Sequence, residues 1–198
     1  MVIESLNEEN YIKEKKVINI VWANVFGIIV FILALLIFGI PYIFIWKSHG
    51  MDFTLFPIIE NTYIRLILFL PIFIIGIIFH EFIHGLFFAI FSEKKFKSIK
   101  YGIMPKEKLF TPYCHCTEIL KINHYRIAAI MPTIILGIIP AGISLLLGDW
   151  TLLFIGSIFI CAGSGDILMI MKIVREKNKV LIYDLPDDAG FILYKTKN

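Results

Sequence analysis

Four long apolar stretches separated by polar segments dominate the sequence. They run from Val17 to about Trp46, from Tyr63 to Phe91, from His124 to Leu147, and from Trp150 to about Met171. Each contains at least the roughly 20 residues that an α-helix needs to cross a bilayer. The pattern predicts an all-α membrane protein with about four transmembrane helices, which makes the lipid bilayer its constant partner.

Proline and glycine divide these stretches. Gly39-Ile40-Pro41 predicts a kink in the first span or its end, and Pro71 predicts a kink in the second. Pro132 and Pro140 interrupt the third span. Gly148-Asp149 predicts a tight turn that leads directly into the fourth.

The longest polar segment between spans, residues 92–123, shows a different periodicity. Alternating apolar residues predict an irregular strand over residues 96–103, a turn at Met104–Glu107, and a returning strand over Leu109–Glu118. Pro112 favours an edge position in that second strand. We therefore expect a small β-hairpin between the second and third helices.

The distribution of charge predicts the topology. Lys and Arg gather before the first span, in residues 92–123 and after the fourth span, whereas the 47–62 connection holds one Lys. By the positive-inside rule, both termini and the hairpin lie in the cytoplasm. This gives a cytoplasmic N-tail (1–16) with room for a short surface helix, a cell-membrane domain (17–174), and a cytoplasmic polar C-tail (175–198).

Composition excludes other classes of protein. Hydrophobic residues make up 58% of the chain and the mean hydropathy is +0.81, which few soluble domains reach. The net charge is only +3, and no basic stripe is interleaved with aromatics, so we expect no nucleic-acid partner. The three cysteines form no disulfide framework. An acidic N-terminus without a small-residue cleavage site predicts no cleaved signal peptide.

The second span contains a candidate metal motif, His80-Glu81-Phe82-Ile83-His84. On a helix, positions i and i+4 share one face, so both imidazoles can bind one metal ion, and Glu81 lies beside it as a general base. Ionisable groups at mid-bilayer cost roughly 2.5–3.5 kcal/mol each and tend to be functional. The alternative interpretation is a polar contact between helices.

A catalytic zinc usually has three protein ligands. A third His six residues beyond the motif is excluded, because position 90 is Ile. The best candidate is Asp166, the only acidic residue within the fourth span. Gly163, Ser164 and Gly165 lack bulk and allow a close approach of helices there. Alternatively, Asp166 caps a broken helix.

Cys114-His115-Cys116 is the competing group of ligands. Thiolates and imidazole bind zinc well, so this cluster could supply a ligand or form a separate regulatory site. The alternative is a pair of reduced thiols on a cytoplasmic hairpin. Glu93, Glu107 and Glu118 lie in the polar segment and are weaker candidates.

These motifs resemble those of the putative zincin peptidase family of small prokaryotic membrane proteins, which is itself similar to site-2 proteases. The likeness covers roughly residues 60–192 and rests on His80–Gly85, Pro112–Cys116 with Glu118, Pro132 with Gly137 and Pro140, Gly165-Asp166, and Asp184–Pro186 with Gly190-Phe191. The resemblance implies that His80, His84 and Asp166 bind zinc and that Glu81 is the general base. The chain departs from typical site-2 proteases in lacking Asn-Pro just before Asp166.

The sequence therefore predicts a zinc-dependent endopeptidase, with one zinc per chain, that cleaves transmembrane or membrane-adjacent protein segments. An edge strand of the hairpin could hold such a substrate extended. Two alternatives remain: a non-catalytic zinc-binding membrane protein that acts as a chaperone or scaffold, and a metal transporter. Glu81 argues against the first, since a structural zinc needs no base. The scarcity of ligands in the first and third spans argues against the second.

Overall fold

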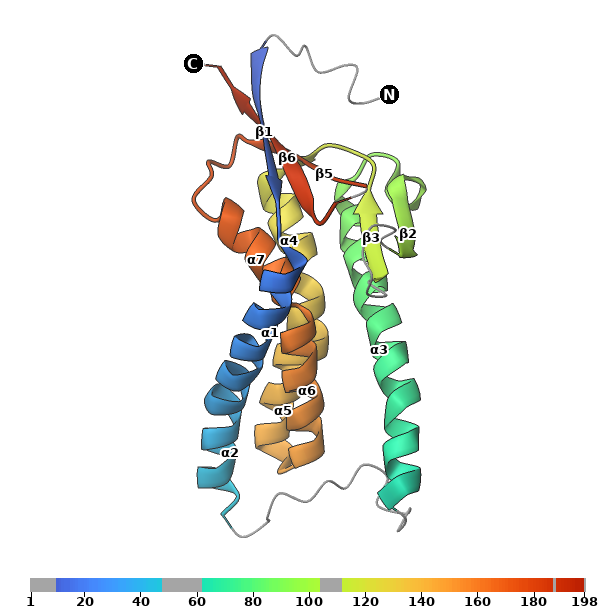
Figure 1. Ribbon diagram of the computed structural model, residues 1–198, viewed down its shortest axis with the longest axis vertical. Helices are drawn as coiled ribbons and strands as arrows, with labels where there is room; N and C mark the ends of the chain where they lie inside the picture. The colour runs from blue at the N-terminus through green and yellow to red at the C-terminus, as the bar shows by residue number, and fades with distance from the viewer. Residues whose placement is uncertain (1–9, 48–61, 104–111, 187, 198) are drawn as a thin grey trace. The chain divides into compact units, whose positions relative to one another are not determined.

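The structure is a computed structural model that describes residues 10–47, 62–103, 112–186 and 188–197. The helices are α1 (Ile20–Ala34), α2 (Ile40–Ile45), α3 (Thr62–Phe91), α4 (Ile122–Pro132), α5 (Ile139–Leu147), α6 (Trp150–Ala162) and α7 (Ser164–Ile173). The strands are β1 (Tyr11–Val17), β2 (Ile99–Ile103), β3 (Pro112–Cys116), β4 (Leu120–Lys121), β5 (Leu181–Asp184) and β6 (Gly190–Thr196) (Figure 1).

The chain divides into two compact units. The helical unit comprises residues 24–80 and 132–164, and the sheet unit comprises residues 1–23, 81–131 and 165–198. Three helical segments, Val21–Ile45, Phe69–Phe91 and Ile122–Leu147, are long and apolar enough to cross a membrane, and the bent pair α6–α7 makes up to four. The prediction of about four apolar helices is thus confirmed.

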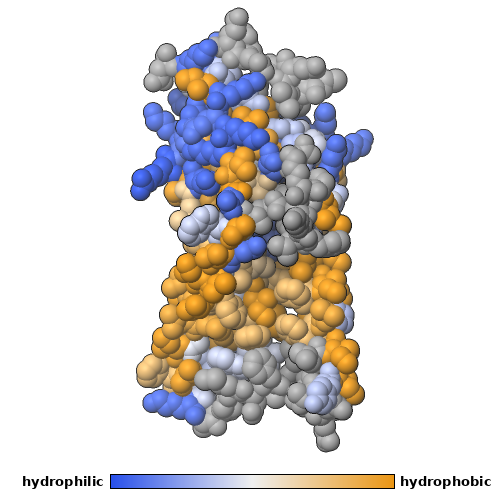
Figure 2. Space-filling view, in the orientation of Figure 1, coloured by the Kyte–Doolittle hydropathy of each residue, from blue (hydrophilic) through white to orange (hydrophobic). Residues whose placement is uncertain are grey.

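Apolar side chains cover the surface of the helical unit. Figure 2 shows hydrophobic residues over its visible face, and side chains such as Ile37 and Leu146 are 63% and 79% exposed. Such an extended apolar surface is far larger than a soluble monomer usually exposes. Its composition is the one expected of helices that face lipid.

Two π-helical turns let long helices pass a proline. Leu35–Gly39 joins α1 to α2 just before Pro41, and Thr133–Ile138 joins α4 to α5 just before Pro140. A proline ring in a regular α-helix clashes with the carbonyl four residues earlier, and a wider turn relieves that clash. Gly39–Pro41 therefore lies where a π-helical turn passes into α2 within one apolar helix, rather than at the end of that helix.

Small residues let α5 and α6 pack closely within the helical unit. A Cβ atom on Gly156 would lie 2.7 Å from the backbone nitrogen of Ala141 and 2.8 Å from the carbonyl oxygen of Gly137. The predicted turn between these helices is present: Gly148 has φ 70°, and the side chain of Asp149 accepts a hydrogen bond from the Leu152 amide at 3.0 Å.

The prediction of an all-α protein with one small hairpin is confirmed only in part, because the described chain is mostly helical but contains two sheets. The first has the strand order β1-β6-β5-β4 with antiparallel neighbours, so the described residues of the predicted N-tail form β1, and the predicted C-tail contributes β5 and β6. Phe191 and Leu193 of β6 are fully buried and pack with Ile122, Ile173 and Ile182. The C-terminal segment is thus part of the core of the sheet unit, and β1 pairs with its last strand.

The second sheet is the predicted hairpin. Strands β2 and β3 pair antiparallel, with Tyr101 opposite Cys114. The expected strand begins later than predicted, because Lys95–Ser98 forms a 3₁₀ turn. The predicted turn at Met104–Glu107 lies outside the described residues.

Candidate metal centre

Helix α3 carries the H-E-x-x-H motif as the sequence predicts. The boundary between the two units falls just before Glu81, but α3 is one continuous helix through this point. His80 and His84 are each only 6% exposed. One helical turn separates them, so their imidazoles lie on the same face of α3.

The ring of His84 is held in a defined orientation within the sheet unit. Its Nδ1 lies 2.9 Å from the carbonyl oxygen of Ala128 in α4. A carbonyl can only accept a hydrogen bond, so Nδ1 carries the proton and donates, and Nε2 of the neutral ring presents a lone pair. Histidines that bind metals are usually oriented in this way.

Asp166 lies where the sequence predicts a third ligand. It occupies the first turn of α7, after the chain bends by 48° between α6 and α7 at Gly163. Its Oδ2 is 3.3 Å from Nε2 of His84. Any two ligand atoms of a tetrahedral zinc, each bonded at about 2.0–2.1 Å, are about 3.3 Å apart. The distance between Nε2 of His84 and Oδ2 of Asp166 therefore fits one shared ion.

His80 completes a group of three candidate ligands. One ligand atom from each of His80, His84 and Asp166 lies within 4.8 Å of the others. Two imidazoles and a carboxylate leave a fourth position for water and are a donor set that catalytic zinc uses. The residues therefore fit the metal that the motif implies.

The β2–β3 hairpin packs against α3 beside Glu81. A Cβ atom on Gly85, one turn after Glu81, would overlap the hydroxyl oxygen of Tyr101, so a larger residue there would displace the Tyr101 side chain. Burial and then the charge of Glu81 raise the pKa of the Cys114 thiol, which faces the same way as Tyr101. This thiol is therefore held in its protonated form at neutral pH.

Two members of the Cys114-His115-Cys116 cluster, His115 and Cys116, are engaged elsewhere in the sheet unit. Nδ1 of His115 lies 3.2 Å from Oδ2 of Asp184, and the hydroxyl of Tyr125 donates to Oδ1 of Asp184 at 3.1 Å. Burial raises the pKa of Cys116 to about 11. Among the described residues, the group of three or more possible ligands does not include this cluster.

The weaker acidic candidates have other positions. The carboxylate of Glu118 accepts hydrogen bonds from the backbone amides of Glu93 and Lys94, at 2.8 and 3.0 Å, and so ties the end of α3 to the start of β4. The side chain of Glu93 is exposed, and Glu107 lies outside the described residues.

Sequence reasoning missed two partners around the site. The Ala128 carbonyl is a backbone group with no signature of its own. Asp184 lay in a segment interpreted as a polar tail, although it is buried and hydrogen-bonded to His115 and Tyr125. A buried carboxylate in that tail becomes recognisable only when β5 is recognised as a strand.

A helix that carries H-E-x-x-H, with a carboxylate oxygen close to it, is the arrangement expected of a zincin-type metal site. A family model described as "Putative zincin peptidase" matches residues 73–181, which is more than half of the chain. The chain belongs to this family. No curated protein and no solved structure matches the sequence.

Proposed function

We propose that this protein is a zinc-dependent endopeptidase of the membrane that cleaves transmembrane or membrane-adjacent segments of other proteins. The observation that carries the proposal is the 3.3 Å separation of His84 Nε2 and Asp166 Oδ2 beside Glu81. A zinc ion at this place would lower the pKa of a water molecule to near 7 and polarise the scissile carbonyl.

Each residue of the centre has a distinct role in this mechanism. His80, His84 and Asp166 hold the ion, and the Ala128 carbonyl keeps His84 in the correct tautomer. Glu81 accepts a proton from the attacking water and later delivers it to the leaving amine. The β2–β3 hairpin has only two strands in the described part of the chain, and an edge of it can pair with an extended substrate segment close to Glu81.

The first sheet supports a topology in which the chain crosses the membrane an even number of times. Strand β1 leads into α1, β4 leads into α4 and β5 follows α7, and all three strands belong to one hydrogen-bonded sheet. In a membrane, the sheet would keep these helix ends on one side. The hydrogen bonds that Glu118 accepts from the backbone amides of Glu93 and Lys94 would keep the end of α3 on the same side as these helix ends. The Lys-rich character of these segments makes that side the cytoplasm.

Cysteine labelling tests this topology. A membrane-impermeant thiol reagent added to intact cells should label Lys47→Cys and leave Lys97→Cys unlabelled, because only Lys47 would face outward. Both side chains are exposed, so burial does not explain the difference. The parent chain, with its own cysteines, is the control, and labelling after lysis shows that both positions react. Labelling of Lys97→Cys in intact cells would contradict the topology.

Removal of zinc tests the chemistry even while the natural substrate is unidentified. The purified full-length protein is stripped with a chelator and incubated with detergent-solubilised membrane proteins, and new N-termini are identified by mass spectrometry. We expect none from the stripped protein and their return on addition of zinc. Magnesium, which prefers an oxygen-only site, should not restore them.

This experiment also separates the alternatives. A non-catalytic zinc protein or a metal transporter would bind zinc at the same residues and generate no new N-termini. The same new N-termini before and after zinc is returned would show contamination or metal-independent cleavage. Either result would overturn the proposed function.

A further inference from the structure

A cavity of about 490 Å³ opens in the sheet unit, away from the metal centre. Four cationic residues line it: Arg175, Lys177 and Lys179 from the loop after α7, and Lys195 from β6. Glu176 is the acidic residue in its lining. The volume is within the range of small-molecule sites, about 300–1,000 Å³.

Glu176 does not neutralise the cations of the loop. Its Oε1 pairs with Lys195 at 2.8 Å and with Lys16 at 3.3 Å, and Lys195 also pairs with Glu14 at 2.7 Å. The hydrogen bond from Lys195 lowers the pKa of Glu176, so this carboxylate stays charged within its own network. Within the described parts of the chain, Arg175, Lys177 and Lys179 form no ion pair with a carboxylate.

Arg126 of α4 holds the loop that carries these three cations. Its guanidinium donates to the carbonyl oxygen of Ile173, to that of Val174 at 3.3 Å and to that of Glu176 at 2.9 Å. It also donates to the side chain of Asn178 at 3.4 Å. Three exposed cations therefore line one cavity on a loop that Arg126 holds in place, and all three can attract an anion there.

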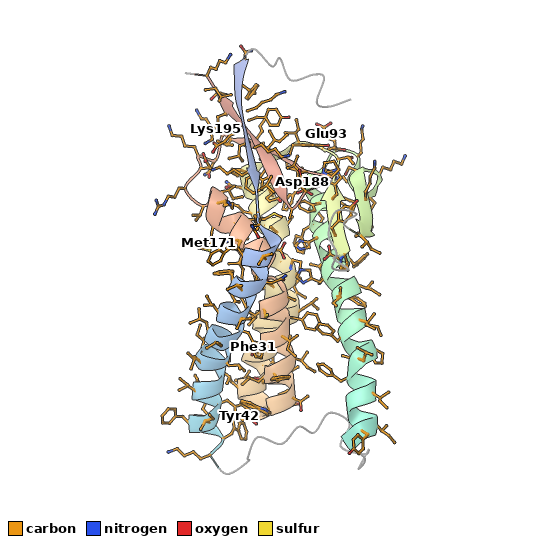
Figure 3. All side chains as sticks on the ribbon, viewed as in Figure 1. Phe31, Tyr42, Glu93, Met171, Asp188 and Lys195 are labelled. Atoms are coloured by element: carbon orange, nitrogen blue, oxygen red, sulfur yellow. The ribbon has the colours of Figure 1, made fainter. Side chains whose placement is uncertain are left out.

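The position of the loop indicates the kind of anion. The loop directly follows α7, and Met171 in the last turn of α7 and Val174 just after it are 57% and 60% exposed. Figure 3 labels Met171 on α7 and Lys195 on β6 within the same unit. Apolar side chains beside a cationic cavity match a ligand with a phosphate group and acyl chains.

We propose that this cavity binds the phosphate of an anionic lipid headgroup. Arg175 supplies planar paired donors to the phosphate oxygens, whereas Lys177 and Lys179 supply point charges. Basic pockets at the cytoplasmic ends of transmembrane helices bind such headgroups. Binding of the lipid holds the sheet unit at a defined height relative to the membrane surface. This role rests on membrane insertion, which the labelling experiment tests separately, and it does not depend on peptidase activity.

Binding is measured on the full-length protein in a neutral detergent. The ligands are a short-chain phosphatidylglycerol, the phosphatidylcholine of the same chain length, glycerol phosphate and inorganic phosphate. We expect phosphatidylglycerol to bind best. The variant Arg175→Gln/Lys177→Gln/Lys179→Gln should bind it on the order of 100-fold more weakly, about 5-fold per lost cation.

A matched control removes three charges elsewhere. Lys94→Gln/Lys97→Gln/Lys100→Gln changes exposed residues outside the cavity and should keep affinity within about 3-fold of the wild type. Equal losses in both triple variants would overturn the proposal in favour of general charge attraction. If glycerol phosphate or inorganic phosphate bound as tightly as phosphatidylglycerol, the cavity would recognise phosphate alone, and the proposal of a lipid ligand would be overturned. Unchanged melting temperature and zinc content would show that the variants are folded.

Discussion

Glu81→Gln is expected to retain zinc and to slow peptide hydrolysis by about 10²–10⁴-fold, the usual cost of a lost general base. Glutamine has nearly the shape of glutamate and keeps one carbonyl oxygen, but it cannot accept a proton at neutral pH. Glu81 is not one of the three residues whose ligand atoms converge, so the metal should stay. Rates are compared on a peptide chosen from the zinc-dependent cleavage products, and zinc is measured by elemental analysis.

Glu93→Gln is the matched control for this variant. Glu93 follows α3 closely, its side chain is exposed, and it engages Glu118 through its backbone amide only. Hydrolysis by this variant should be unchanged. Equal rates for wild type and Glu81→Gln would contradict the peptidase mechanism, whereas loss of zinc from Glu81→Gln would place Glu81 among the ligands.

The apolar helices and the hairpin are predictable because their signals are local. The long apolar runs define the candidate spans, and the alternation over residues 96–118 defines β2 and β3. The sheet built from the two tails has no such local signal. Strands β1 and β6 lie at opposite ends of the chain, and charged residues such as Glu14, Lys15 and Lys16 hide the alternation in β1. That sheet forms only when segments far apart in the sequence pair with each other, so neither segment alone predicts it.

The metal centre is predictable to a different degree at each residue. The spacing of His80 and His84 follows from the period of one helix, so sequence alone places both rings together. Asp166 was inferred from the cost of a carboxylate in an apolar segment. Its 3.3 Å approach to His84 depends on the bend at Gly163 and on the packing of the sheet unit. The Ala128 carbonyl that orients His84 depends entirely on that packing.

The sheet also gives the metal centre a rigid support. Helices α3, α4 and α7 each contribute to the centre, through His84, Ala128 and Asp166 respectively. Phe88 of α3, Ile122 of α4 and Ile173 of α7 all pack in the core beneath the sheet. Tails that looked peripheral in the sequence therefore cover the core that holds these three helix ends in register.

Asp166→Ala should weaken zinc binding by more than about 100-fold, because even changes outside the first coordination shell typically cost about 10–100-fold. The variant leaves two imidazoles on α3, and two ligands do not hold zinc as tightly as three. Competition with a chromogenic chelator measures the affinity.

Asp149→Ala is the matched control for this variant. It removes the aspartate that caps the start of α6, and it should bind zinc normally. Cys114→Ser tests the competing cluster in the same assay. Retention of zinc by Asp166→Ala with loss from Cys114→Ser would move the third ligand from α7 to the hairpin.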